Sequence, residues 1–152
     1  MTDVELLESK IFKYAFDVPI NQKADKLWSN LIEQIDAWWM ADFRALGEGS
    51  KVSLSLGENG VLVEKGPSGE TLEWYRVQMC VPGKSLYLVG HVAPDWGGPT
   101  TSMLKLEITA DGDASRLTVS DALLGNVSKA KAEGVEDGWK QMFNTLKIFC
   151  EK

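Results

Sequence analysis

The sequence predicts an α+β fold: a strongly curved antiparallel sheet of about seven strands wraps around a long C-terminal helix, with two short helices after the first strand. Three observations predict it. A strand-like alternation near the N-terminus leads into helical spacing. A β pattern then continues for about eighty residues, far longer than any single strand. The chain ends in a long apolar stripe at helical spacing. We expect one domain over residues 1–152.

The N-terminal third contains one strand and then helix. Residues 11–19 alternate between apolar and polar side chains, which indicates a half-buried strand. Residues 24–35 carry apolar side chains at helical spacing and predict an amphipathic helix. Trp38 and Trp39 follow at a spacing that continues into a second, short turn of helix.

The central segment consists of short strands separated by turn residues. Asn59-Gly60 predicts a hairpin in which both turn residues take positive φ. Pro82-Gly83 marks another tight turn. The adjacent aromatics Trp74-Tyr75 interrupt the alternation of their strand, which indicates a β-bulge. Consecutive hairpins make an antiparallel sheet, and its apolar face needs helices to cover it.

The last segment predicts a helix over residues 129–151, on the order of 30 Å long. Val135, Trp139, Met142, Phe143 and Leu146 fall on one continuous apolar face. Where this helix does not fill the concave side of the sheet, we expect a cavity between the two.

Composition sets limits on the function. The chain has 44% hydrophobic and 25% charged residues, as globular domains do. No apolar run is long enough to span a membrane, and the acidic first residues lack a secretory pattern, so we expect a cytoplasmic protein. The net charge of −6 argues against nucleic acid and membrane insertion. The distant Cys80 and Cys150 and the single His91 predict neither a disulfide framework nor a metal site, and we expect no cofactor.

Six tryptophans and one aspartate suggest where a site lies. Trp39, Trp74 and Trp139 fall where helix and sheet would enclose the cavity, either as ordinary core or as the aromatic lining of a pocket. Asp121 shares its strand face with apolar Val119 and Leu123. Either a bulge or a strand end turns it to solvent, or it is a polar anchor at the cavity mouth.

Several segments, in this order and spacing, carry a resemblance to a known superfamily. They are Phe16-Asp-Val-Pro-Ile-Asn21, Ala24-Asp-Lys-Leu-Trp28, Trp38-Trp39, the run from Gly69 to Val81 leading into Pro82-Gly-Lys-Ser-Leu86, Ala114-Ser-Arg-Leu-Thr-Val119 and Gly138-Trp-Lys-Gln-Met-Phe-Asn-Thr-Leu146.

The sequence resembles the START-like (SRPBCC) superfamily with its helix-grip fold, in the branch of heat-shock chaperone ATPase activator homologues. Such sequences often carry an aromatic residue late in the fifth strand, where Gly90 or His91 stands here. The resemblance implies a pocket for an apolar or amphipathic small molecule and supplies no catalytic motif. A chaperone partner with a role in stress response, a homodimer, and a cyclase or dehydratase that uses Asp121 as its acid/base group are the alternatives.

We therefore assign no catalytic residue and expect ten residues to line the cavity. They are Trp39, Trp74, Tyr75, Val77, Met79, Leu88, Leu106, Asp121, Trp139 and Phe143.

Overall fold

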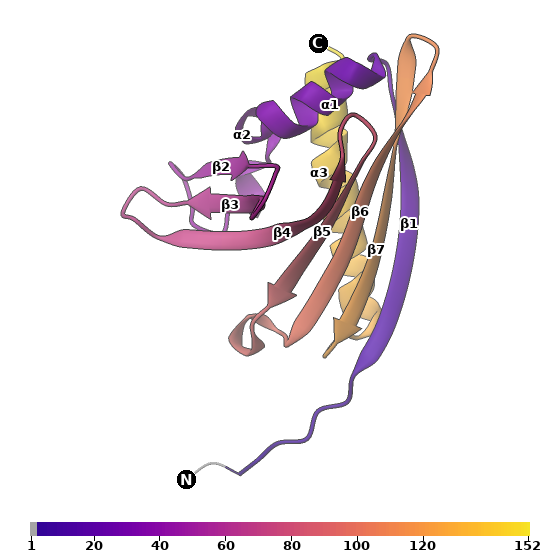
Figure 1. Ribbon diagram of the computed structural model, residues 1–152. Helices are drawn as coiled ribbons and strands as arrows, with labels where there is room; N and C mark the ends of the chain where they lie inside the picture. The colour runs from indigo at the N-terminus through magenta and orange to yellow at the C-terminus, as the bar shows by residue number, and fades with distance from the viewer. Residues whose placement is uncertain (1–2) are drawn as a thin grey trace.

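The computed structural model describes residues 3–152 and contains a seven-stranded antiparallel sheet with helices on its concave side (Figure 1). The strands lie in the order β1-β7-β6-β5-β4-β3-β2. This arrangement confirms the predicted fold class. The strands are β1 (Lys10–Ile20), β2 (Lys51–Leu54), β3 (Val61–Lys65), β4 (Thr71–Val81), β5 (Ser85–Val92), β6 (Thr100–Asp111) and β7 (Ala114–Gly125).

The strand pairing follows the chain, with one exception. Strands β2 to β7 form consecutive antiparallel hairpins, as the turn residues predict. Strand β1 instead pairs with the last strand, β7, and this register places Tyr14 opposite Asp121. The first and the last strand of the chain therefore lie side by side in the sheet.

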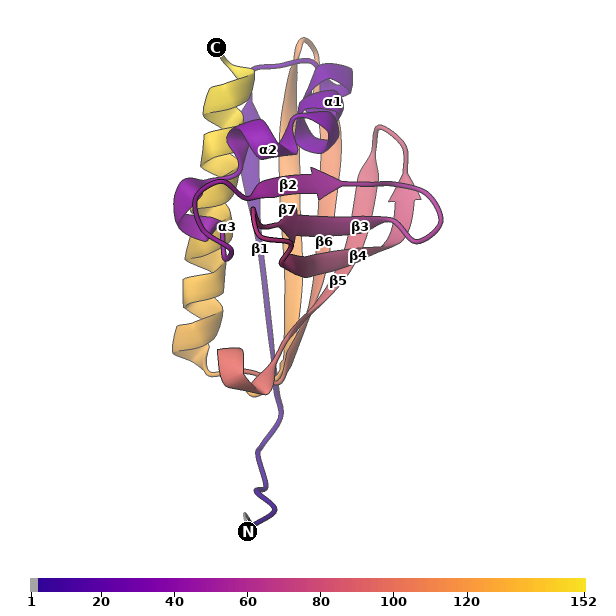
Figure 2. The same cartoon turned by 90° about the vertical axis from the view of Figure 1, so that its left-hand side faces the viewer.

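The helices cover the concave face from two directions. α3 (Lys129–Cys150) runs along the molecule, while α1 (Ala24–Glu33) and α2 (Ile35–Trp38) lie across one end of the sheet (Figure 2). The hydroxyl of Ser128 caps α3 by accepting a hydrogen bond from the Lys131 N–H. Two single turns of 3₁₀ helix, η1 (Ala41–Phe43) and η2 (Pro94–Trp96), complete the structure.

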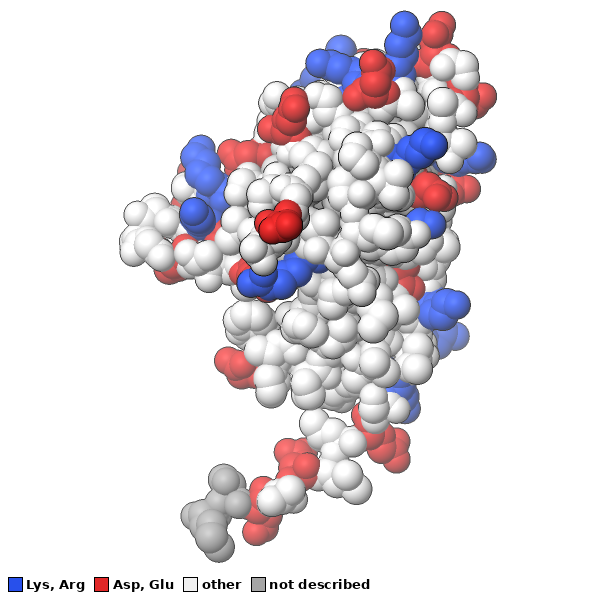
Figure 3. Space-filling view, viewed as in Figure 1, with Lys and Arg blue, Asp and Glu red and all other residues white. Residues whose placement is uncertain are grey.

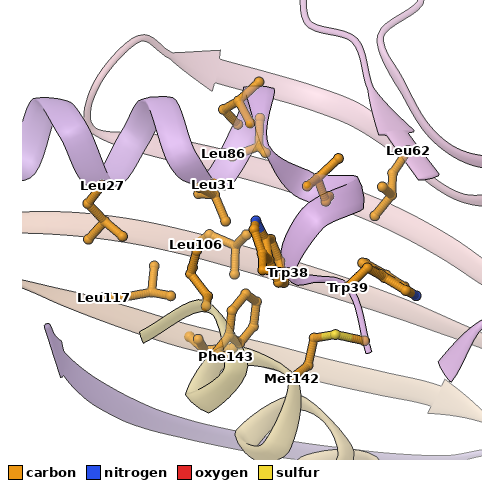
Figure 4. Close-up of a cluster of buried hydrophobic side chains, with 14 of the residues drawn as sticks. Leu27, Leu31, Trp38, Trp39, Leu62, Leu86, Leu106, Leu117, Met142 and Phe143 are labelled. Atoms are coloured by element: carbon orange, nitrogen blue, oxygen red, sulfur yellow. The ribbon is translucent and has the colours of Figure 1, made fainter. Parts of the chain in front are cut away.

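The core lies where these helices meet the sheet. Side chains from α1, α2, α3 and the strands converge there, with Trp38 and Phe143 close together (Figure 4). In α3 the buried residues concentrate in the C-terminal half, and Ala132 is the buried residue of the first turns. Val135 is 36% exposed, so the apolar stripe is less covered near its start than the sequence predicts.

Two bulges in β4 decide which of its side chains face the helices. Trp74 is the extra residue between the pairs Leu62–Tyr75 and Val63–Glu73, which confirms the predicted bulge. A second irregularity between Val77 and Met79 was not predicted.

The second irregularity reverses the faces of the strand end. Cys80 packs against the core, whereas Met79 is 47% exposed on the outer face. The prediction that Met79 faces the interior is therefore wrong, because simple alternation does not survive an extra residue. In Figure 3 most charged side chains lie toward the top and the edges of the molecule, with one acidic and one basic group left of the middle and a continuous uncharged area below them.

The connection between β2 and β3 also differs from its prediction. Asn59 has a φ of 60°, but Gly60 does not take positive φ. A Cβ atom on Gly60 would lie 2.6 Å from the carbonyl oxygen of Ser55. Glycine is needed at this position for close backbone approach rather than for a left-handed conformation.

Candidate functional site

A chain of hydrogen bonds crosses the concave face over four strands. The hydroxyl of Tyr14 on β1 donates to Oδ2 of Asp121 on β7 at 2.7 Å. The hydroxyl of Ser102 on β6 donates to Oδ1 of Asp121 at 2.8 Å. The hydroxyl of Tyr75 on β4 lies 2.7 Å from Ser102 Oγ. Because the Ser102 proton points to Asp121, Tyr75 donates to Ser102.

Asp121 is therefore an inward-facing carboxyl, only 3% exposed. Of the two possibilities left open by the sequence, the structure selects the buried one, since β7 continues straight through this position. The alternation of β7, which places Asp121 on the same face as Val119 and Leu123, predicts this inward position. Tyr14 and Ser102 also have inward parity, but nothing in the sequence links them to Asp121.

A missing side chain on β5 lets Tyr75 reach across that strand. Gly90 lies between β4 and β6. A Cβ atom at this position would lie 2.9 Å from the Tyr75 ring and 2.4 Å from the carbonyl oxygen of Trp74. The aromatic residue absent from late β5 is thus replaced in space by a ring from β4.

Burial controls the protonation of this polar chain. It raises the pKa of Asp121 above its usual range, although the hydrogen bonds from Tyr14 and Ser102 act in the opposite direction. Burial and the neighbouring Asp121 charge raise the pKa of Tyr14 and of Tyr75. Both phenols therefore stay protonated and act as donors.

The shift at Asp121 gives a pH-dependent prediction. Because its pKa is raised in the folded state, its contribution to stability is present below the ordinary aspartate pKa of about 3.9 and is lost as the pH rises through the folded value. An asparagine at position 121 does not ionise, so the Asp121→Asn variant does not lose stability in this way. We expect the variant to gain stability relative to wild type as the pH rises through this window, measured by urea denaturation. A pH-independent difference would contradict the prediction.

An aromatic cluster lies beside the polar chain. Trp39, the residue that follows α2, contacts Trp74 of β4 and Trp139 of α3, with ring centroids 5.5 and 6.3 Å apart. Trp139 stacks on Phe143 at 5.3 Å and lies 6.0 Å from the ring of Tyr75. Tyr75 thus belongs to both the aromatic cluster and the polar chain.

A second buried carboxylate fixes one wall of the aromatic cluster. Glu64 on β3 is fully buried and accepts hydrogen bonds from the Trp74 indole N–H at 3.1 Å and from the Ser50 hydroxyl at 2.7 Å. The backbone N–H groups of Ala45 and Leu46 also donate to it. Burial opposes its ionisation, but the bonds from Ser50, Leu46, Trp74 and Ala45 outweigh burial and lower the pKa of Glu64. In the sequence, the only sign of this burial is that Glu64 lies on the same face of its strand as Leu62.

The structure places nine of the ten predicted lining residues on the inner side of the sheet or on the helices that face it. Leu88 and Leu106 are buried core residues, and Val77 is half-buried against the same core. Met79 is the exception already described. The role of the nine in binding stays a prediction. They are Trp39, Trp74, Tyr75, Val77, Leu88, Leu106, Asp121, Trp139 and Phe143.

Two surface pockets lie away from the aromatic cluster. One, of about 320 Å³, is at the strand ends beside His91, Asn126 and the N-terminal Leu7. The other, of about 450 Å³, is bordered by Lys13, Met103 and neighbouring residues of β1, β6 and β7. Among residues 3–152, no group of three metal-ligating side chains occurs. No helix of this described part is long and apolar enough to cross a membrane.

Solved structures share this architecture. Mll3558 from Rhizobium loti superposes with a TM-score of 0.72 at 19% identity, covering 93% of this chain and 99% of that one. Ara h 8.0201 gives 0.66 at 10% identity, over 93% and 97%. DynU16 of the dynemicin biosynthetic locus gives 0.67 at 17%, over 92% of this chain and 47% of that one. The likeness establishes the shared fold, a curved antiparallel sheet around a long C-terminal helix.

The sequence gives the narrower assignment. The family model described as Activator of Hsp90 ATPase homolog 1-like protein matches residues 21–151. The chain therefore belongs to that family, as its sequence motifs predict. A comparison with curated proteins gives no match.

Proposed function

We propose that this chain binds an apolar or amphipathic small molecule between α3 and the concave face of the sheet. The observation that carries the proposal is the contact between the polar chain and the aromatic cluster, which meet at Tyr75 and Trp139. Sites for small molecules combine apolar and aromatic walls with a few placed polar groups. Here the polar groups come from β1, β4, β6 and β7, and the rings come from β4, α3 and the residue that follows α2.

The N-terminal half of α3 is the proposed entrance. Val135 is 36% exposed, and Trp139, one turn further along, is only half-buried. A Cβ atom on Gly134 would have no neighbour within 4 Å. Because this half of the helix packs loosely, a ligand that enters here displaces Trp139 rather than the buried Phe143.

A blocking substitution tests the site. In Val135→Trp, we expect the added ring to occupy the entrance and to weaken binding of the neutral fluorophore N-phenyl-1-naphthylamine at least about tenfold, or 1.4 kcal/mol. Because residue 135 is partly exposed, the melting temperature should stay within about 3 °C of wild type. The measurement is a fluorescence titration with a parallel thermal melt.

The same helix offers a matched control. Ile148 is 53% exposed in the C-terminal half of α3, so Ile148→Trp adds a similar ring away from the entrance. We expect Ile148→Trp to bind the fluorophore as wild type does. Equal binding by both variants would contradict the proposed entrance, and no binding by wild type would contradict the function. Native mass spectrometry of protein purified from its own host then gives the mass of the natural ligand.

Asp121 supports a second function, acid/base catalysis on the bound molecule. A buried carboxyl with a raised pKa, held by Tyr14 and Ser102, has the properties of a proton donor. Under this second proposal, Asp121→Asn abolishes turnover even at ligand concentrations that saturate the variant. A chaperone partner and a cytoplasmic location stay predictions, and the ATPase rate of a heat-shock chaperone tests the first.

A further inference from the structure

The inner face of the sheet carries a carboxylate with no cationic partner. Asp121 is 3% exposed, and its two oxygens accept hydrogen bonds from the neutral hydroxyls of Tyr14 and Ser102. Six ion pairs occur among residues 3–152, and none includes Asp121 or the buried Glu64. The ionised form of a carboxyl group in such surroundings attracts any cation that reaches it, and the cation in turn favours that form.

Among the described residues, no lysine or arginine forms an ion pair with Asp121 from the inner face. Lys13 of β1 is exposed and borders the surface pocket of β1, β6 and β7, and Lys105 of β6 is paired with Glu107. β1, β4 and β6 contribute Tyr14, Tyr75 and Ser102, which are neutral donors. On α3, Glu136 acts on Tyr14 as a further negative charge. Lys140 is 3.4 Å from Glu136 and is already paired with it.

The aromatic cluster acts in the same direction. The faces of tryptophan and tyrosine rings carry partial negative charge and attract organic cations. Trp39, Trp74 and Trp139 lie together, and Tyr75 joins them to the polar chain. A molecule held between these rings and Asp121 meets negative potential on both sides, which favours an ammonium group and disfavours a carboxylate.

We propose that the ligand is an organic cation, an amine with an apolar body, whose ammonium group lies against Asp121. This inference rests on the proposed function and narrows it from any apolar or amphipathic molecule to one charge class. The preference comes from Asp121 and the neighbouring rings of the inner site rather than from the overall net charge of −6.

Three probes of equal chain length test the inference. Decylamine, decanol and decanoate share a ten-carbon chain and carry a positive, a neutral and a negative head group at neutral pH. Each is titrated against bound N-phenyl-1-naphthylamine at physiological ionic strength, where exposed charges beyond about 8 Å are largely screened. We expect decylamine to displace the fluorophore at a concentration at least about tenfold lower than decanoate, with decanol between them.

Two variants of equal net charge show whether Asp121 is the cause. Asp121→Asn and Asp137→Asn each remove one negative charge, but Asp137 lies exposed on α3. We expect Asp121→Asn to bring decylamine to the level of decanol in the same variant. We expect Asp137→Asn to keep the wild-type order.

The outcomes separate the two proposals. If the fluorophore binds but decanoate competes as well as decylamine, or if Asp121→Asn keeps the preference, the cation inference is wrong and the binding function stands. If the fluorophore and all three probes fail to bind to wild type, the binding function is wrong and the inference falls with it.

Discussion

Trp39→Ala is expected to lower the free energy of unfolding by about 4 kcal/mol, since truncation of a buried tryptophan leaves a large cavity. Trp39 is 4% exposed, and its ring contacts those of Trp38, Trp74 and Trp139. The substitution also removes the hydrogen bond from its indole N–H to the carbonyl oxygen of Phe43. For a domain of this size, the melting temperature should fall by roughly 10 °C.

An exposed tryptophan supplies the control. Trp96 in η2 is 61% exposed, and Trp96→Ala should change stability by no more than about 0.5 kcal/mol. Chemical denaturation of both variants measures the difference. If Trp39→Ala is as stable as Trp96→Ala, the aromatic cluster is not a structural unit and its rings are free to move for a ligand.

Glu64→Gln is expected to lower the free energy of unfolding by about 3 kcal/mol at neutral pH. The glutamine keeps the size of the side chain but turns one acceptor oxygen into a donor. Oε1 accepts from Ala45 and Trp74, and Oε2 accepts from Leu46 and Ser50. Whichever oxygen is replaced, the new NH₂ group therefore faces at least one N–H group that cannot accept from it. Because the Trp74 indole N–H donates to Glu64, the fluorescence of Trp74 should also change.

The loss of stability caused by Glu64→Gln should be larger at neutral pH than in acid. The pKa of Glu64 is lowered in the folded protein, so its contribution is present above the ordinary glutamate pKa of about 4.3 and is lost as the pH falls through the folded value. The gap between wild type and Glu64→Gln should therefore narrow in acid. Glu107→Gln, which removes an exposed ion pair with Lys105, should cost at most about 1 kcal/mol. Equal losses for the two variants would contradict the buried network.

The sequence predicts most of the fold because the signals are local. Alternation in β1, helical spacing in α1 and α3, and turn residues between the hairpins each specify one element without knowledge of the others. The predictions of side-chain orientation fail where a bulge adds a residue and shifts the alternation of inward and outward side chains. The bulge at Trp74 has a visible signal in two adjacent aromatics, whereas the irregularity after Val77 has none, and this reverses Met79.

The candidate site is harder to predict because its contacts join distant parts of the chain. Strand parity brings Asp121 to the inner face, but its partner Tyr14 is 107 residues away. Ser102 reaches Asp121 diagonally, since its direct neighbour on β7 is Leu123. Glu64 shares the inner parity of Leu62 and was missed, because its four donors come from a loop and a bulged strand with no pattern of their own.

The glycine at position 90 makes two positions of the chain depend on each other. The Tyr75 ring occupies the volume that a side chain on β5 would fill, so the pair Tyr75–Gly90 is one solution to a single packing problem. A large residue at 90 would need both a small residue at 75 and a shift of the Trp74 carbonyl oxygen, which lies 2.4 Å from that Cβ position, and it would leave Ser102 without its phenol. Positions 75 and 90 should therefore change together among relatives, and each exchange would change the polar end of the site.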